Sequence, residues 1–180
     1  MPDPADAPSS AKPPGPASRL GIGIIAGTLI VDQLTKLIAD AALEQETLIH
    51  ILPILGLYLT YNPGIAFSFL TGSNTTLLLS LVIVITIAVL VLWTRSSEGG
   101  KLSAIGFGLI VGGAVGNIVD RIVQGHVVDF LLLHFGDRDL FIFNLADFAL
   151  TVGPILLIYA YLFGPSPAVR KKQDDAESDG

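Results

Sequence analysis

The sequence predicts an integral membrane protein, mainly α-helical, with four transmembrane helices and a small extracytoplasmic β-sheet. Of its 180 residues 51% are hydrophobic and only 14% are charged. The apolar residues also form long blocks rather than the alternating faces of a water-soluble protein. A hydrocarbon core of about 30 Å needs about 20 helical residues. Four blocks approach that length: 20–39, 77–94, 102–119 and 145–163.

The chain begins with a segment rich in Pro, Ala and Ser, residues 1–18. We expect this segment to be disordered, because it has no periodicity that could form a buried face. The first apolar block follows it and resembles the core of a secretory signal. It continues, however, into Asp32, Gln33 and Lys36 without a small-residue cleavage site. We therefore predict that this block is retained as the first membrane helix.

The two longer connections, after the first and third helices, show strand patterns. Residues 56–61 alternate with a period of two before an Asn-Pro-Gly turn. Segments 131–135 and 140–144 flank the polar residues 136–139 like the arms of a hairpin. A small outer sheet is therefore expected.

The third helix carries Gly108, Gly112 and Gly116 at a spacing of four residues. This spacing places three positions without side chains on one helical face, where another membrane helix can approach closely. Tight packing there would draw Asn117 and Arg121 toward the neighbouring helices.

The positions of Lys and Arg predict the orientation. Basic residues precede the first helix, join the second to the third and follow the fourth, whereas residues 40–70 contain acids but no Lys or Arg. By the positive-inside rule, both termini are cytoplasmic and the longer loops are exported. Four of the acids behind the net charge of −6 lie in the last seven residues, within an expected disordered cytoplasmic tail at 165–180, so no nucleic-acid partner is expected.

In this topology, the unusual polar residues share one depth, the outer boundary of the bilayer. An ionisable group at mid-bilayer costs about 2.5–3.5 kcal/mol, and the helix centres carry none. The shared depth indicates a site, although the same residues could simply mark helix ends. They are Asp32, Lys36, Asn62, Asn117, Asp120, Arg121, Asp129, Asn144 and Asp147.

Asp129 and Asp147 are the strongest candidates for chemistry. Asp129 is a lone carboxylate in an apolar stretch, and Asp147 lies where an outer strand becomes a membrane helix. Asp147 could instead be a helix N-terminal acid, which is typically worth about 0.3–1 kcal/mol. Two acids at one depth also supply the parts of an aspartic dyad, in which one acid holds a proton while the other activates water.

Other residues have simpler interpretations. Asp120 and Arg121 could form an ordinary helix-end pair, and residues 137–139 suit a hairpin turn. Trp93 and three tyrosines are expected in the aromatic belts at the bilayer surfaces. The chain has no cysteine, and its three histidines lack the spacing of a metal site. We therefore expect no metal and no cofactor.

Five short motifs occur in order along the chain: DQLTK at 32–36, YNPGIAF at 61–67, GGAVGNIVDR at 112–121, VVDF at 127–130 and FNLAD at 143–147. Together they resemble the motifs of the bacterial lipoprotein signal peptidases, also called signal peptidase II. The resemblance extends over about residues 20–163. Each motif alone is weak, but five in order on the expected topology are specific.

This resemblance implies an aspartic endopeptidase of the bacterial cytoplasmic (inner) membrane, with a membrane peptidase domain at 19–164. Such enzymes remove signal peptides from diacylglyceryl-modified prolipoproteins immediately before the lipidated cysteine, at the outer face of the membrane. The expected partners are these substrates and membrane lipid, and the expected state is a monomer. By motif match, Asp129 and Asp147 are the catalytic pair. The matching substrate-binding positions are Asp32, Lys36, Asn62, Gly113, Asn117, Arg121, Asn144 and Ala146.

Two other classes of protein are compatible with the residues alone. A small carrier or proton-coupled transporter would also place carboxylates in membrane segments. Such proteins usually bind their substrate near the midplane between repeats, whereas this sequence has no internal repeat and a bare midplane. A non-catalytic membrane scaffold would tolerate the loss of both Asp129 and Asp147.

Overall fold

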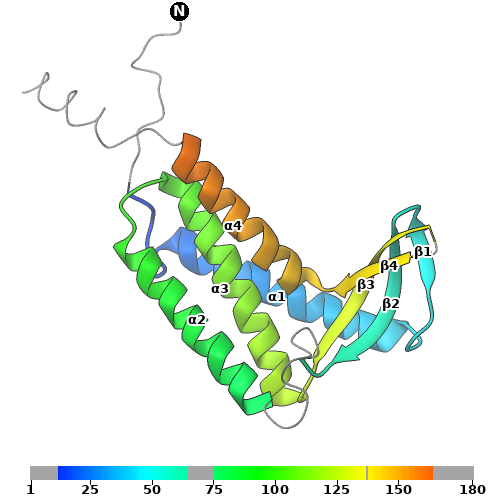
Figure 1. Cartoon of the computed structure of the whole chain (residues 1–180). Helices are drawn as coiled ribbons and strands as arrows, with labels where there is room; N and C mark the ends of the chain where they lie inside the picture. Colours follow the sequence, from blue (N-terminus) through cyan, green and yellow to red (C-terminus); the bar gives the residue numbers. More distant parts are fainter. Residues whose placement is uncertain (1–11, 65–74, 137, 164–180) are drawn as a thin grey trace, which may run out of the picture.

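The computed structural model describes residues 12–64, 75–136 and 138–163. These residues form a helix bundle with a small sheet projecting from one end (Figure 1). The helices are α1 (Arg19–Ala42), α2 (Thr75–Arg95), α3 (Gly100–Val123) and α4 (Leu145–Phe163), and the strands are β1 (Ile49–Leu52), β2 (Leu55–Asn62), β3 (Val127–Phe135) and β4 (Arg138–Phe143).

All four of these helices are long and apolar enough to cross a membrane, which confirms the predicted fold class. Three of them extend beyond the predicted apolar blocks, and α3 continues through Asp120 and Arg121. Hydropathy identifies only the part of a helix that hydrocarbon can cover. The backbone of α3 continues to the turn at Gly125, whose φ of 78° ends the helical path.

The central helix α3 packs against two helices through two glycine-lined faces. A Cβ added at Gly112 would lie 2.7 Å from Thr28 Cβ on α1, and one at Gly106 would lie 2.8 Å from the Gly153 carbonyl on α4. The first face was predicted from the spacing of its glycines. The second face, which includes Gly106 and Gly113, was not predicted. These glycines are seven residues apart, and such a spacing does not by itself show that another helix packs against them.

The sheet is antiparallel, in the order β1-β2-β3-β4. The predicted β3–β4 hairpin is confirmed, with Leu131 opposite Phe143. Two features differ from the expected pattern. The edge strand β1 was not predicted, and β3 begins at Val127, so that Asp129 lies within a strand opposite Thr60 of β2.

The end of the bundle away from the sheet corrects two expectations. Trp93 is only 1% exposed instead of lying in an aromatic belt, and its indole N–H donates to the Pro14 carbonyl at 2.9 Å. A buried indole needs such an acceptor. Part of the segment expected to be disordered therefore lies against the bundle. Residues 16–17 form a turn, and Ser18 Oγ accepts from the backbone N of Gly21 at 3.0 Å to cap α1. The rest of the predicted tails, 1–11 and 164–180, lies outside the described residues.

Candidate active site

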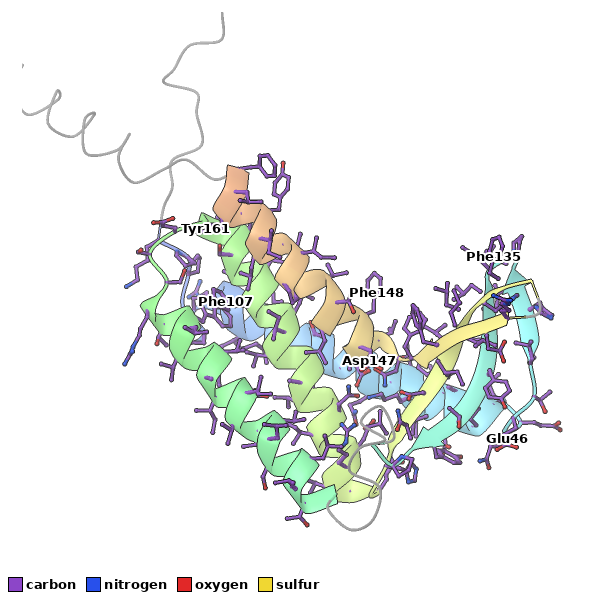
Figure 2. All side chains as sticks on the ribbon, in the orientation of Figure 1. Glu46, Phe107, Phe135, Asp147, Phe148 and Tyr161 are labelled. Atoms are coloured by element: carbon purple, nitrogen blue, oxygen red, sulfur yellow. The ribbon has the colours of Figure 1, made fainter. Side chains whose placement is uncertain are left out.

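The polar residues that the sequence singled out meet where the helix bundle joins the sheet. Figure 2 shows Asp147 at this junction, at the start of α4. All ten predicted site residues belong to this region. They are Asp32 and Lys36 in α1, Asn62 in β2, Gly113, Asn117 and Arg121 in α3, Asp129 in β3, Asn144 between β4 and α4, and Ala146 and Asp147 in the first turn of α4.

Asn144 is fully buried and contacts both candidate catalytic acids. Its Nδ2 donates to Asp129 Oδ1 at 2.6 Å, and its backbone N donates to Asp147 Oδ2 at 3.3 Å. Its Oδ1 accepts from the backbone N of Asp147 at 2.9 Å. The last two bonds form a reciprocal cap on α4, so Asp147 is also the helix N-terminal acid that the sequence suggested.

Asp129 lies in a buried environment and is only 2% exposed. Asn62 Nδ2 donates to its Oδ2 at 3.0 Å. Burial, together with the nearby Asp147 carboxylate, raises the pKa of Asp129 to about 6, and the hydrogen bonds from Asn62 and Asn144 oppose this rise. Asp129 therefore retains a proton at pH values where an ordinary carboxyl group is ionised.

Asp147 receives a side-chain amide from α3. Asn117 Nδ2 donates to Asp147 Oδ1 at 2.8 Å, while Asn117 Oδ1 accepts from Lys36 Nζ at 2.9 Å. Each acid is thus bound by neutral amide donors, and among the described residues neither forms an ion pair with a Lys or Arg.

The charged residues of α1 form a buried ion cluster with α3. Lys36 Nζ lies 2.8 Å from Asp32 Oδ2 and 2.7 Å from Asp120 Oδ2, and Asp32 Oδ1 accepts from the backbone N of Ala146 at 2.8 Å. Asp120 thus pairs with Lys36, not with Arg121 as a helix-end residue. Asp120 lies three residues after Asn117 on the face of α3 that meets α1, and a buried ammonium needs such counter-ions.

Gly113 and Ala146 bring α3 and α4 together beside the acids. A Cβ at Gly113 would lie 2.6 Å from the Ala146 carbonyl oxygen, and Ala146 is fully buried. The polar atoms of Asp32, Lys36 and Asn117 likewise bind other protein groups. Their burial favours a positioning role for these five residues over direct contact with a ligand.

Arg121 differs from these residues because part of its guanidinium is unsatisfied. Its Nη1 donates to the Asn117 carbonyl at 3.1 Å. Its Nε is buried and has no hydrogen-bond partner among the described residues. The charges of Asp147 and Asp129 both act on this guanidinium. Since buried polar atoms normally have partners, Arg121 has a donor available beside the acids.

Gln33 belongs to the same network, a role that its residue type and position did not predict. Its Nε2 donates to Asp120 Oδ1 at 2.7 Å and lies 3.3 Å from Asp32 Oδ2. The available signal was its place in DQLTK, as a polar residue of a membrane helix at the depth of the other site residues.

Two apolar grooves adjoin Phe148, and the first of them also adjoins Asp147. The first has a volume of about 340 Å³ and lies between β4 and α4. The second, of about 400 Å³, lies mainly between α1 and α4. Phe148 lines both, is 57% exposed and projects away from the bundle in Figure 2. The first groove is lined by Phe141, Ile142, Phe143, Asp147, Phe148 and Thr151.

No group of His, Cys, Asp and Glu suited to holding a metal ion occurs in the described part of the chain. His50 and His134 contact each other, with ring centroids 5.0 Å apart, and His126 packs against Tyr61.

Comparison with known proteins gives a consistent family assignment. Residues 24–163 match the family model described as Signal peptidase (SPase) II. A lipoprotein signal peptidase from Mesorhizobium japonicum is 37% identical over 78% of this chain and 84% of its own length. One from Rhodopseudomonas palustris is 38% identical over 79% of this chain and 93% of its own length.

Solved structures agree with this assignment. A structure described as "Bacterial membrane enzyme structure by the in meso method at 1.9 A resolution" superimposes with a TM-score of 0.70 and 32% identity, over 78% of this chain and 91% of that one. A second structure with the corresponding description at 2.3 Å gives a TM-score of 0.68 and 31% identity, over 78% of this chain and 86% of that one.

Proposed function

The chain belongs to the signal peptidase II family, and from this premise we propose how it acts. As a member, it is a membrane-embedded aspartic protease that removes signal peptides from prolipoproteins. We propose that it cleaves diacylglyceryl-modified prolipoproteins immediately before the lipidated cysteine, with Asp129 and Asp147 as a water-activating dyad. The observation that carries this proposal is the binding of Asn144 to both acids, which holds the buried Asp129 and the half-buried Asp147 at one junction.

The environments of the two acids support different roles. Asp129, with its raised pKa of about 6, is suited to hold the proton of the dyad. Asp147 lies in the first turn of α4, where the helix N-terminus favours a carboxylate, whereas Asp129 lies in a strand. We propose that Asp147 removes a proton from water as the water oxygen attacks the scissile carbonyl carbon. Asp129 gives its proton to the carbonyl oxygen. When the C–N bond of the tetrahedral intermediate breaks, Asp147 gives its proton to the leaving amine and Asp129 takes back the hydroxyl proton as the new carboxyl group forms, which restores the dyad.

Asn62 and Arg121 are the residues proposed to bind the substrate backbone. The Nδ2 of Asn62 contacts Asp129 directly, so Asn62 stands at the edge of the dyad. The buried Nε of Arg121 has no partner among the described residues, and a peptide carbonyl would supply the missing acceptor. The other predicted site residues would then shape the site without touching the peptide. They are Asp32, Lys36, Gly113, Asn117, Asn144 and Ala146, and of these Asn144 binds both acids.

The groove between β4 and α4 is a suitable place for an acyl chain of the substrate. Three aromatic side chains, Phe141, Phe143 and Phe148, line it together with Asp147. The lipid is attached at the residue that follows the scissile bond, so its chains must begin within a few bonds of the catalytic carboxylates. An apolar wall at that point lets the lipid remain in hydrocarbon during cleavage.

We place the sheet and the dyad at the outer face of the cytoplasmic membrane, with both termini in the cytoplasm. The distribution of Lys and Arg supports this orientation. The sheet also exposes large apolar side chains, including Ile51, Leu52, Phe135 and Phe141, as expected for a sheet lying against lipid. The catalytic unit is proposed to be a monomer, since one chain supplies both acids and the amide donors that bind them.

Cleavage by the purified chain tests the proposal. A diacylglyceryl-modified prolipoprotein should lose its signal peptide, and the mature product should begin at the lipidated cysteine by mass spectrometry. The same precursor without lipid is the matched control and should be cleaved far more slowly. Equal cleavage of both precursors, or a product that begins elsewhere, would contradict the proposed specificity.

A further inference from the structure

The Asn117 amide has a defined orientation, and that orientation determines what Asp147 receives. Asn117 Oδ1 accepts from Lys36 Nζ at 2.9 Å and from Asn144 Nδ2 at 3.3 Å. If the amide turned over, its NH2 group would face the Lys36 ammonium and its oxygen would face the Asp147 carboxylate, two repulsive contacts. The charge of Lys36 therefore directs an N–H donor toward Asp147.

Lys36 depends on more than one counter-ion to stay in this position. Its side chain is 3% exposed, so its charge must be balanced by protein groups. One oxygen of Asp32 accepts from the backbone N of Ala146, at the start of α4. Only the other oxygen of Asp32 contacts Lys36, so Asp32 alone balances the charge of Lys36 incompletely. Asp120, 1% exposed and 2.7 Å from Lys36 Nζ, supplies the second negative charge.

Gln33 holds Asp120 in place. Its Nε2 donates to Asp120 Oδ1 at 2.7 Å and lies 3.3 Å from the Gly116 carbonyl oxygen. Both carboxylate oxygens of Asp120 are thus engaged, one by Gln33 and one by Lys36. Neither Gln33 nor Asp120 has a hydrogen bond or ion pair to Asp129 or Asp147 within the described residues.

We infer that Asp120 and Gln33 are positioning residues for Asp147, acting through Lys36 and Asn117. The inference rests on the proposed catalytic role of Asp147. Without the charge of Asp120, Lys36 is held less firmly and the Asn117 amide is free to turn, so Asp147 loses a donor. Turnover then falls, while KM changes little because Asp120 does not contact substrate.

Loss of this donor also changes the pH profile. The dyad works with one proton, and its second proton binds more readily when Asp147 has fewer donors. The acidic limb of kcat/KM should therefore move to higher pH. The charged groups that face Asn117 and Asp147 are Asp32 and Lys36 from α1, Asp120 and Arg121 from α3, and Asp129 from β3.

A double-mutant cycle on the full chain tests the route through Asn117. Asp120→Asn should lower kcat roughly 10- to 100-fold in the otherwise unchanged enzyme, within the coupling range of contacting residues. In an Asn117→Ala enzyme, whose own kcat is reduced, the same change should cost less than about twofold. Asp120→Glu should restore part of the activity, and exposed Asp139→Asn is the matched control that should change neither kcat nor the pH profile.

Normal turnover of Asp120→Asn, or an equal loss in both backgrounds, would overturn the inference. Thermal unfolding in detergent shows whether each variant folds. Gln33→Leu retains every charge and carries the test if Asp120→Asn does not fold: it should lower kcat and move the acidic limb in the same direction, and an unchanged profile would count against the inference. Failure of the proposed function itself would be seen separately, as an unmodified enzyme that leaves the lipidated precursor intact.

Discussion

At the scale of single residues, the site is defined by amide groups that hold two acids in different environments. Asn62 and Asn144 donate to Asp129, and Asn117 and Asn144 donate to Asp147. Neutral donors orient a carboxyl group without fixing its charge as strongly as a bound cation would. The acids therefore remain able to exchange protons, as general acid–base catalysis requires.

Replacing either acid with Asn should abolish most of the activity. Asn keeps the size and much of the hydrogen bonding but cannot exchange a proton, so cleavage of the lipidated precursor should fall by at least about 100-fold for Asp129→Asn and for Asp147→Asn. The double variant should be little worse than either, because the pair acts as a unit. Near-normal turnover of either variant would exclude the dyad.

The control for this experiment is Asp139→Asn. Asp139 is exposed in β4 and should tolerate the change. The sequence alone placed Asp120 at a helix end, where its replacement would cost little. Its burial beside Lys36 excludes it, because removing one member of a buried ion pair is strongly destabilising. Asp137, in the expected hairpin turn, lies outside the described residues.

The pH dependence should respond to Asn62. Its hydrogen bond lowers the pKa of Asp129, so Asn62→Ala should raise that pKa above about 6. The alkaline limb of kcat/KM, which reports loss of the dyad proton, should then move to higher pH. A profile measured from pH 4 to 9 checks this, and a shift to lower pH would mean that Asp129 is not the proton carrier.

The same pKa affects the stability of the fold. Its ordinary value is 3.8, and the folded value is about 6, so the folded state binds this proton more tightly than the unfolded state does. The stabilisation from Asp129 is thus fully present below about pH 3.8 and is lost as the pH rises through about 6. When Asp129 gives up its proton during catalysis, the free energy of unfolding of the protein therefore falls.

At the scale of elements, close contact between α1 and α3 allows the ion cluster to form. A Cβ at Gly116 would lie 2.5 Å from Asp32 Oδ2, so this glycine leaves the space that the Asp32 carboxylate occupies beside Lys36. The polar network is therefore coupled to helix packing, and a change in either should be felt in both.

Gly116→Ala should lower both stability and activity. The added methyl group displaces Asp32, and overpacking of this kind typically costs about 1–3 kcal/mol. Gly23→Ala on α1 is the matched control, because a Cβ there meets nothing within 4 Å. Thermal unfolding and precursor cleavage should both be impaired in the first variant only. Equal behaviour of the two variants would contradict the packing role of Gly116.

At the scale of the whole molecule, the arrangement suits a bilayer that covers the helices and supports the sheet. Exposed side chains on the helices are large and apolar, for example Leu37 at 66% and Ile38 at 63%. Water would solvate such surfaces poorly, whereas the hydrocarbon of a bilayer solvates them well. The ion cluster of Asp32, Lys36 and Asp120 is instead buried within the protein, where each charge has a partner of opposite sign.

Single cysteines test the proposed orientation, because the chain has no cysteine of its own. Asp139→Cys, on the sheet, should react with a membrane-impermeant maleimide added outside spheroplasts. Ser97→Cys, in the exposed connection between α2 and α3, should react only after the membrane is permeabilised. The reverse pattern would invert the topology and place the dyad at the cytoplasmic face.

Local sequence alone predicted the four helices, the hairpin of β3 and β4, and the candidate acids Asp129 and Asp147. These features depend on local sequence, since the length of an apolar block identifies a spanning helix and a period of two identifies a strand. The family motifs added the surrounding positions.

Only the tertiary structure decided which residues bind one another. Gln33 and Asp120 are 87 positions apart, and Asp32 reaches Ala146 over 114 positions. Such pairings depend on how far each helix is rotated about its axis and how closely the helices approach, which the glycine-lined faces of α3 determine. For the same reason Asp120 was assigned to a helix end and Trp93 to the bilayer surface: hydropathy gives a residue's depth in the membrane but not the direction in which its side chain points.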